Sequence, residues 1–475
     1  PTPAGVGSVY PSAVNVTAAI AIGVYAGAVV VLAWLSRRDT AIDYLLAGRR
    51  LTTPAFVATL VATWYGGVLG VGEYSYRFGI SNWLVFGVPY YLAALAFAFV
   101  LAGRVRASAV LSIPEQLAAA YGRPAARLGA ALVLLMCVPA AYVLMLGDLV
   151  RIYLGLDLVP AVVVSTAFTA GYVAVGGFRG VVRANELQFA LMFAAFLVVL
   201  PTALARTGGV GGLWSALPPA SRSWDGGLGT QAVLVWYVIA MQTLVEPTFY
   251  QRCYAARSPA IARRGVLVSI GFWLVFDFLT TFTGLAARVL LPDLDDPVLA
   301  YPRLGALVLP PLANALFAVG LFATVMSTSH SYLFLAAATV GHDILPVSAG
   351  SERRRTAVGL AVAALAAVAL ALTLRSVVAI WHDVGSVVTA SLLLPLSLSH
   401  FGRRAAFRPG SAMVAIASSA AVALAWIASR EVSGSYPLGV EPVFPALGVS
   451  AACWLAGRAG KGGEGRGVAR QRRSS

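Results

Sequence analysis

The chain has 475 residues, of which 59% are hydrophobic and only 11% charged, and its mean hydropathy is +0.82. A soluble domain carries roughly 25% charged residues, so this composition excludes an ordinary soluble protein and predicts an all-α polytopic membrane protein. The net charge is +15. Because most basic residues fall in loops on one side of the expected spans, we assign this charge to membrane orientation and not to nucleic-acid binding.

Thirteen apolar runs follow one another, each of about 20 residues or more, which is the length needed to cross a hydrocarbon layer of about 30 Å. We expect membrane helices at 14–35, 53–75, 81–103, 125–154, 158–177, 185–205, 229–250, 264–291, 305–335, 356–374, 377–400, 411–429 and 437–457. The first run lacks a basic leader and a cleavage site, so we expect a retained helix and not a signal peptide. The bias of basic loops places the N-terminus outside the cell membrane and the C-terminus in the cytoplasm.

The second expected span is rich in glycine. Gly66, Gly67, Gly70 and Gly72 fall in its second half, and each glycine costs about 1 kcal/mol of helix stability relative to alanine. Unwound backbone within a membrane is tolerated only where protein or a water-filled cavity satisfies its carbonyls. The segment therefore indicates a broken helix at a binding site, with a small-residue face for close helix packing as the alternative.

The seventh expected span, IAMQTLVEPTFYQR, contains a second candidate break. Pro247 removes a backbone donor, and Glu246 is an ionisable group that hydrocarbon disfavours. Interrupted helices at corresponding places point to an inverted repeat of five plus five helices. We expect an extracellular N-terminus with a leading helix (1–52), a first repeat (53–205), an extracellular loop (206–228), a second repeat (229–400), two trailing helices (401–457) and a basic cytoplasmic tail (458–475). We expect the tail to be disordered.

A cluster of hydroxyl residues lies within the ninth expected span, in LFATVMSTSHS at 321–331. Hydroxyl oxygens at neighbouring helix positions, together with a carbonyl one turn earlier, are the hard ligands that a small dehydrated cation requires. The cluster indicates a cation site. Hydrogen bonds of Ser and Thr to their own helix, or close helix packing, are the alternative.

Several motifs in this order resemble the sodium:solute symporter family, which includes proline, sugar, sialic acid, pantothenate and choline carriers. The resembling segments are DYLLAGRRL at 43–51, ATWYGG at 62–67, SIPEQLAAAYG at 112–122, GGFRGVVRANELQ at 176–188, YQRCYAAR at 250–257, ATVMSTSHS at 323–331 and HDIL at 342–345. The resemblance implies a leucine-transporter-type fold, coupling to a sodium ion and a small organic solute.

The resemblance also implies binding residues. The family's sodium site corresponds here to the carbonyls of Leu60, Thr63 and Thr324 and the hydroxyls of Ser327 and Thr328. These oxygens carry no formal charge, which favours a balance between binding and release.

The family's solute-binding positions correspond to residues of both broken helices, namely Tyr65, Gly66, Gly67, Gln242 and Glu246. Aromatic residues surround them, and ATWYGG resembles the choline carriers more than the sugar carriers. Aromatic faces with one carboxylate favour an organic cation or a zwitterion that presents its amine, although aromatic residues in spans also serve as packing or interface anchors.

One position departs from the family pattern. Asn185 stands where the family commonly has an aspartate, which puts a second sodium ion in doubt. Glu186 points about 100° away around the helix and either pairs with Arg183 or has another role. The sequence leaves Asp277 open between a cavity residue and a coupling carboxylate, and His330 between a structural and a proton-sensitive role.

We therefore expect a secondary active transporter that carries a small organic solute with sodium into the cell by alternating access. The alternatives are a ligand-sensing receptor with the same fold and a symporter coupled to protons. We expect no enzyme, because no nucleophile, base and orienting group occur together at motif spacing.

Overall fold

The computed structural model describes residues 16–37, 40–108, 110–349, 351–374, 377–402 and 404–471, and this part of the chain forms helices and no strand. Residues 14–15 of the first expected span and 472–475 of the tail lie outside it. The helices are α1 (Val16–Leu35), α2 (Ala41–Leu46), α3 (Thr53–Trp64), α4 (Val68–Phe78), α5 (Val88–Ala96), α6 (Gly103–Ala107), α7 (Ile113–Tyr121), α8 (Arg123–Cys137), α9 (Ala140–Leu154), α10 (Leu158–Arg206), α11 (Gly209–Ala216), α12 (Pro219–Arg222), α13 (Thr230–Ile239), α14 (Pro247–Ala255), α15 (Pro259–Leu290), α16 (Ala300–Val308), α17 (Pro311–Ala338), α18 (Glu352–Leu374), α19 (Val377–Ser399), α20 (Pro409–Ser433) and α21 (Val443–Gln471).

Ten helical segments of the described chain are long and apolar enough to cross a membrane. One of them, α10, contains two of the expected spans, because the helix continues across Gly177, where a φ of 56° breaks its geometry without a loop. The apolar part of α21, Val443–Arg458, is shorter. An all-α, multi-pass membrane protein is confirmed, whereas the count of thirteen spans and the side on which each terminus lies stay predictions.

Both expected helix breaks are present. Between α3 and α4 the chain tightens into the 3₁₀ turn η2 (Tyr65–Gly67), so the break is a narrowed turn and not an extended segment. Between α13 and α14 it passes through η5 (Ala240–Leu244), and Glu246 then adopts extended geometry as the N-cap of α14. Proline at the first position of α14 suits this start because its missing N–H is unpaired at a helix N-terminus in any case.

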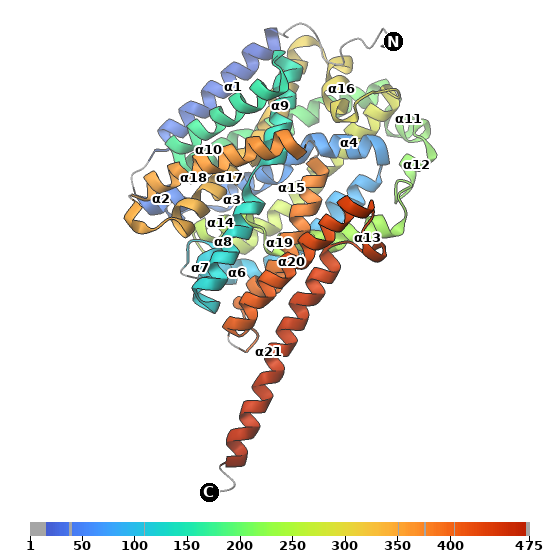
Figure 1. The fold of residues 1–475 in the computed structure, drawn as a ribbon. Helices are drawn as coiled ribbons and strands as arrows, with labels where there is room; N and C mark the ends of the chain where they lie inside the picture. Colours follow the sequence, from blue (N-terminus) through green and yellow to red (C-terminus); the bar gives the residue numbers. More distant parts are fainter. Residues whose placement is uncertain are drawn as a thin grey trace.

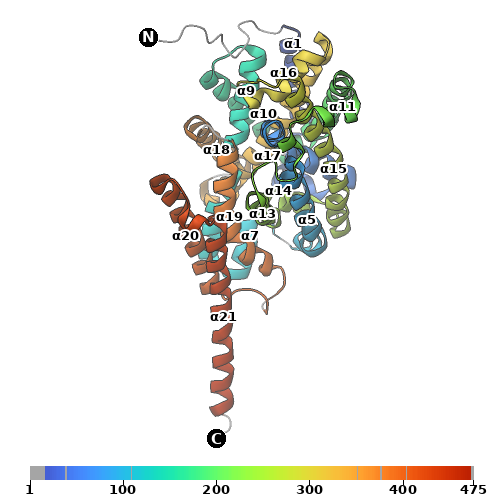
Figure 2. The same cartoon turned by 90° about the vertical axis from the view of Figure 1, so that its right-hand side faces the viewer.

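Some boundaries differ from those expected. The expected span 125–154 is divided at Val138–Pro139 into α8 and α9, because proline interrupts the hydrogen-bond ladder. The expected loop 206–228 contains the short helices α11 and α12. The expected disordered tail is helical instead, since α21 continues to Gln471 and extends away from the other helices (Figures 1 and 2).

Helix α17 lies at the centre of the bundle and packs most extensively against α10, with α1, α3, α9 and α18 also in contact (Figure 1). Most of its side chains are buried, including its hydroxyl residues. The segment before α3 is tied to the end of α14 by two backbone hydrogen bonds of Leu51, from its N–H to the Ala255 carbonyl and from the Arg257 N–H to its carbonyl, each 3.0 Å long. These bonds hold the two broken helices against each other, and both α3 and α14 also contact α17.

Candidate ion and solute sites

Hydroxyl groups of α17 face the backbone at the end of α3. Ser327 Oγ lies 2.6 Å from the Ala62 carbonyl oxygen and 2.7 Å from that of Thr324, within donating distance of both. Thr328 Oγ1 donates to the Thr63 carbonyl at 2.5 Å. The contacts of Ser327 with Ala62 and of Thr328 with Thr63 each join residues 265 positions apart in the chain.

Of the sodium ligands implied by the resemblance, Thr63, Thr324, Ser327 and Thr328 are therefore joined by direct contacts. Leu60 lies one turn before Thr63 on α3, and the other α3 carbonyl in contact with this site is that of Ala62. All five are 2% exposed or less. The Thr324 hydroxyl donates to the Gly320 carbonyl at 2.6 Å, so Thr324 offers its carbonyl to this site. A buried set of uncharged carbonyl and hydroxyl oxygens from two helices fits a dehydrated monovalent cation.

The two glycines of η2 have different neighbours. A Cβ on Gly66 would overlap the side chain of Thr328, so this glycine permits the close approach of α3 to α17. A Cβ on Gly67 would overlap the indole of Trp381. Of these two predicted solute positions, Gly67 lines the central cavity and Gly66 faces the hydroxyl site.

A second polar cluster adjoins the hydroxyl site. Nη2 of Arg252 donates to the hydroxyl oxygens of Thr63 (2.7 Å), Ser331 (3.0 Å) and Thr59 (3.2 Å). Nδ2 of Asn185 donates to the same three oxygens, at 2.7 Å for Thr59, 3.3 Å for Thr63 and 3.4 Å for Ser331. The expected span 229–250 ends before Arg252 and would place it in a loop, but α14 continues to Ala255 and the arginine is 0% exposed.

The structure also shows the contacts of His330 and Glu186, whose roles the sequence left undecided. His330 bonds through Nε2 to Asn185 Oδ1 at 2.8 Å and through Nδ1 to the Tyr172 hydroxyl at 2.5 Å, so both ring nitrogens have hydrogen-bond partners. Glu186 pairs with Arg183 at 3.1 Å on a more exposed part of α10 and takes no part in the site.

A central cavity of about 110 Å³ lies between the two helix breaks. Aromatic side chains from several helices form most of its wall, and two carboxylates and one amide also line it. The lining includes Trp64, Tyr65, Gly67, Phe86, Tyr90, Tyr142, Trp236, Gln242, Glu246, Asp277, Tyr332 and Trp381.

The two carboxylates of this cavity are held by different helices. Glu246 Oε1 accepts hydrogen bonds from the Tyr332 hydroxyl (2.8 Å) and from Thr248 Oγ1 (3.2 Å), and it also caps α14. Asp277 of α15 accepts a hydrogen bond from the Tyr91 hydroxyl. Asp277 also lines the cavity. The sequence could not place it there, because no local pattern shows that residue 277 lies beside residue 91.

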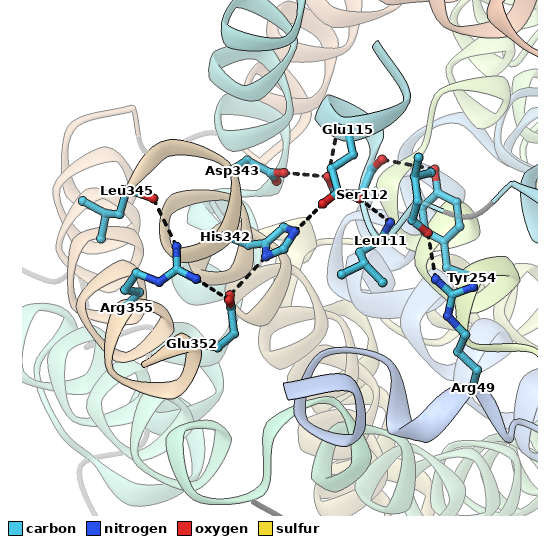
Figure 3. Close-up of polar contacts among 11 residues, drawn as sticks. Arg49, Leu111, Ser112, Glu115, Tyr254, His342, Asp343, Leu345, Glu352 and Arg355 are labelled. Atoms are coloured by element: carbon cyan, nitrogen blue, oxygen red, sulfur yellow. Dashed lines mark hydrogen bonds and ion pairs between the residues drawn. The ribbon is translucent and has the colours of Figure 1, made fainter. Parts of the chain in front are cut away.

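A second pocket lies beyond the start of α14. Pro247 and Tyr250 line this pocket, whereas Glu246 lines the central cavity, so the first turn of α14 separates the two. Figure 3 shows polar contacts at this pocket: His342 lies 2.7 Å from Glu115 of α7 and 3.3 Å from Glu352 of α18.

Further contacts extend this polar cluster across three helical segments. Ser112, the N-cap of α7, donates to Asp343 at 2.6 Å, and Arg355 pairs with Glu352 (Figure 3). Burial raises the pKa of Glu115, but hydrogen bonds from His342 and from the Leu111 N–H outweigh it and hold that pKa below its usual value. The segments SIPEQ and HDIL resemble family motifs, and no pattern in the sequence indicates that they are in contact.

Residues 44–411 match the model of the sodium:solute symporter family. The chain belongs to this family. The high-affinity choline transporter 1 of Caenorhabditis elegans is 22% identical over 72% of this chain and 64% of its own length. The osmoregulated proline transporter OpuE of Bacillus subtilis strain 168 is 22% identical over 84% of this chain and 88% of its own length. The human sodium/myo-inositol cotransporter 2 is 25% identical over 64% of this chain, which spans 52% of that protein's length.

Solved structures show the fold of this family member. A Na⁺-coupled sialic acid symporter in a substrate-bound outward-open state superimposes with a TM-score of 0.77 at 18% identity, covering 93% of this chain and 96% of that one. The transporter MhsT in complex with L-phenylalanine gives a TM-score of 0.53 at 14% identity, covering 89% and 99%. These similarities confirm the leucine-transporter-type fold.

Proposed function

We propose that this protein is a sodium-coupled symporter for a small organic cation, or for a zwitterion that presents its amine. The observation that carries this proposal is the central cavity, where aromatic walls and two carboxylates, Glu246 and Asp277, meet at the two helix breaks. Aromatic faces attract a cation through their quadrupole, and a desolvated cavity strengthens this attraction. The named relatives carry a quaternary amine, an amino acid and a polyol, so the chemistry of the cavity, and not their names, selects the solute class.

Coupling between sodium and solute binding follows because α3 contributes residues to both sites. Thr63 of α3 belongs to the hydroxyl site and Tyr65 to the central cavity, only two residues further along the chain. A sodium ion bound between α3 and α17 would stabilise one conformation of the end of α3, and the solute would bind to that same conformation. Each ligand then raises the affinity of the other, as reciprocal linkage requires. Asn185 lacks the charge of the aspartate that the family commonly has at this position, so we propose one sodium ion per solute and inward transport by alternating access.

A thermal-shift screen of the purified protein tests this function. The probes are choline, glycine betaine, proline, myo-inositol and lactate, each in sodium chloride and in potassium chloride of equal ionic strength. We expect the largest stabilisation from an amine-bearing probe in sodium, with a sodium Hill coefficient near one. Stabilisation by myo-inositol or lactate alone would contradict the proposed solute class, and equal shifts in potassium would contradict sodium coupling.

A further inference from the structure

A large apolar cavity lies apart from the central cavity and shares no lining residue with it. Its volume is about 280 Å³, and it lies between α1, α9, α10 and α17, which pack against one another (Figure 1). Most of its wall is aliphatic or aromatic. The wall includes Ile22 of α1, Val150 of α9, Phe168 of α10, and Phe322 and Met326 of α17.

The polar side chains of this cavity are already hydrogen-bonded to the protein. The hydroxyls of Ser165 and Thr169 each donate to a backbone carbonyl of α10, at 3.2 and 2.8 Å. The Tyr25 hydroxyl donates to Met326 Sδ at 3.7 Å and accepts from Nε2 of Gln188 at 2.7 Å. A buried water needs about two to four polar partners, and apolar cavities of about 150 Å³ stay dry and take up hydrocarbon. This space therefore suits a hydrocarbon ligand and not water.

One end of the cavity lies at the surface that faces lipid. Gly23 and Val164 line the cavity and are exposed, Val164 to 55%. Their exposed neighbours on α1, Ile20 and Val24, are apolar as well. The apolar windows of α1 and α10 are only 28% and 39% buried inside the protein, against 83% for the segment that contains α17. The exposed side chains of such spans contact the hydrocarbon of the bilayer, so the cavity is continuous with it.

The other end of the cavity lies against α17. Phe322 and Met326 are at most 5% exposed, and Met326 directly precedes Ser327 of the proposed sodium site. The two side chains project about 100° apart around the helix. A molecule in the cavity therefore contacts the helix that carries the sodium hydroxyls, next to those hydroxyls.

We propose that this cavity is a binding site for the acyl chain of a membrane lipid, which enters beside Gly23 and Val164 and ends against Phe322 and Met326. The lipid headgroup stays outside, because the polar side chains of the wall are already engaged. An acyl chain in the cavity supports α17 in the position that brings Ser327 to α3, so bound lipid raises the affinity for sodium. This second step rests on the proposed sodium site, whereas lipid binding does not.

Photo-crosslinking tests lipid binding without reference to sodium. The full chain is reconstituted into phosphatidylcholine vesicles that contain phosphatidylcholine with a diazirine in its acyl chain, and labelled residues are mapped by mass spectrometry. We expect labelling of Phe322 and Met326 although both are buried. Labelling confined to exposed positions such as Ile20 and Val24 would overturn the inference.

Gly23→Phe and Gly27→Phe form a matched pair of variants on α1. A Cβ on either glycine meets no atom within 4 Å, and both substitutions raise helix propensity, but only Gly23 lines the cavity. Gly23→Phe should reduce the labelling of α17 about tenfold, because the ring occupies the entrance, and Gly27→Phe should leave it at the wild-type level. Equal labelling of α17 in the two variants would contradict this site.

Sodium affinity tests the second step separately. The protein is purified in a detergent that has a steroid body and no acyl chain, and phosphatidylcholine is then added. In the wild type and in Gly27→Phe, the lipid should lower the sodium concentration for half-maximal thermal stabilisation about fivefold, and in Gly23→Phe it should not. Labelling of α17 without this lipid effect would refute the link to sodium. Labelling of α17 in a protein that sodium does not stabilise at all would count against the proposed sodium site and not against the lipid site.

Discussion

The hydroxyl site and the central cavity share helix α3 but differ in charge. The proposed sodium ligands around the end of α3 are uncharged oxygens, and all of them are buried. The central cavity is wider, is walled by aromatic rings and contains the carboxylates of Glu246 and Asp277. Both regions favour a cation, but of different kinds: uncharged oxygens can enclose a small ion completely, whereas a bulky organic cation spreads its charge over aromatic faces and a counter-charge.

The difference also indicates how the two sites communicate. Tyr332 of α17 lies one turn after Thr328 and donates to Glu246 in the wall of the cavity. The helix that carries the sodium hydroxyls therefore also contacts the cavity carboxylate. A change in the position of α17 against α3 would reach the cavity by two routes, through η2 and through Tyr332.

The largest effect should come from removing the two hydroxyls of the ion site. In the double variant Ser327→Ala with Thr328→Ala, two interactions with a charged ligand are lost, each worth about 1.5–3 kcal/mol. The sodium concentration for half-maximal uptake, or for half-maximal thermal stabilisation, should rise by about 100-fold or more.

Ser329→Ala is the matched control for this variant. Ser329 lies on the same helix and is equally buried, but its hydroxyl has no hydrogen-bond partner among the described residues. Its removal should leave the sodium dependence unchanged. A double variant that retains the wild-type sodium response would show that the ion does not bind between α3 and α17.

A smaller effect should follow from neutralising the cavity. Glu246→Gln should weaken binding of an amine-bearing solute by about 10- to 100-fold, because a charged partner worth roughly 1.5–3 kcal/mol becomes neutral. Sodium binding measured without solute should be spared. Isothermal titration of the solute in saturating sodium measures the first quantity, and sodium thermal shifts measure the second.

Glu186→Gln provides the control, since Glu186 is a carboxylate outside the cavity. If Glu246→Gln instead binds the solute normally but loses the pH dependence of uptake, Glu246 is a proton-linked group. If it is unchanged in both respects, the preference for an organic cation loses its main support. Glu246 does not extend toward a loop, because the side chain is 1% exposed and caps α14.

The helix breaks predicted from the sequence are confirmed, whereas the site roles of the residues near them stay predictions, and both rest on local features. Glycines at 66 and 67, Glu246 before Pro247 and the hydroxyls at 327 and 328 each carry their signal within a few neighbouring residues. Local propensity and the hydrocarbon environment suffice to place helix breaks and polar atoms there. The family resemblance then supplied the pairing between α3 and α17.

The features that were missed depend on contacts between distant segments. Arg252 meets Thr63 across 189 positions, and His342 meets Glu115 across 227. A span boundary placed at residue 250, five residues before α14 ends, was enough to put a buried arginine into a loop. Counting basic residues gives the net bias of a loop and cannot show which individual side chain turns inward.

The smallest expected effect concerns the link between the two regions. Tyr332→Phe removes the hydroxyl that donates to Glu246 but retains the ring in the cavity wall. We expect sodium affinity without solute to remain at the wild-type value and the increase in sodium affinity on adding solute to fall about fivefold, which corresponds to roughly 1 kcal/mol of coupling.

Tyr153→Phe is the control, because the buried Tyr153 hydroxyl has no partner among the described residues although its ring lies 6.3 Å from Phe322 of α17. The effects of Tyr332→Phe and Glu246→Gln on the coupling should not be additive. In the double variant, Tyr332→Phe should reduce the coupling little further, since one hydrogen bond joins the two side chains. Full additivity, or a change in sodium affinity without solute, would show that Tyr332 acts on the ion site itself. The two regions would then communicate through η2 alone.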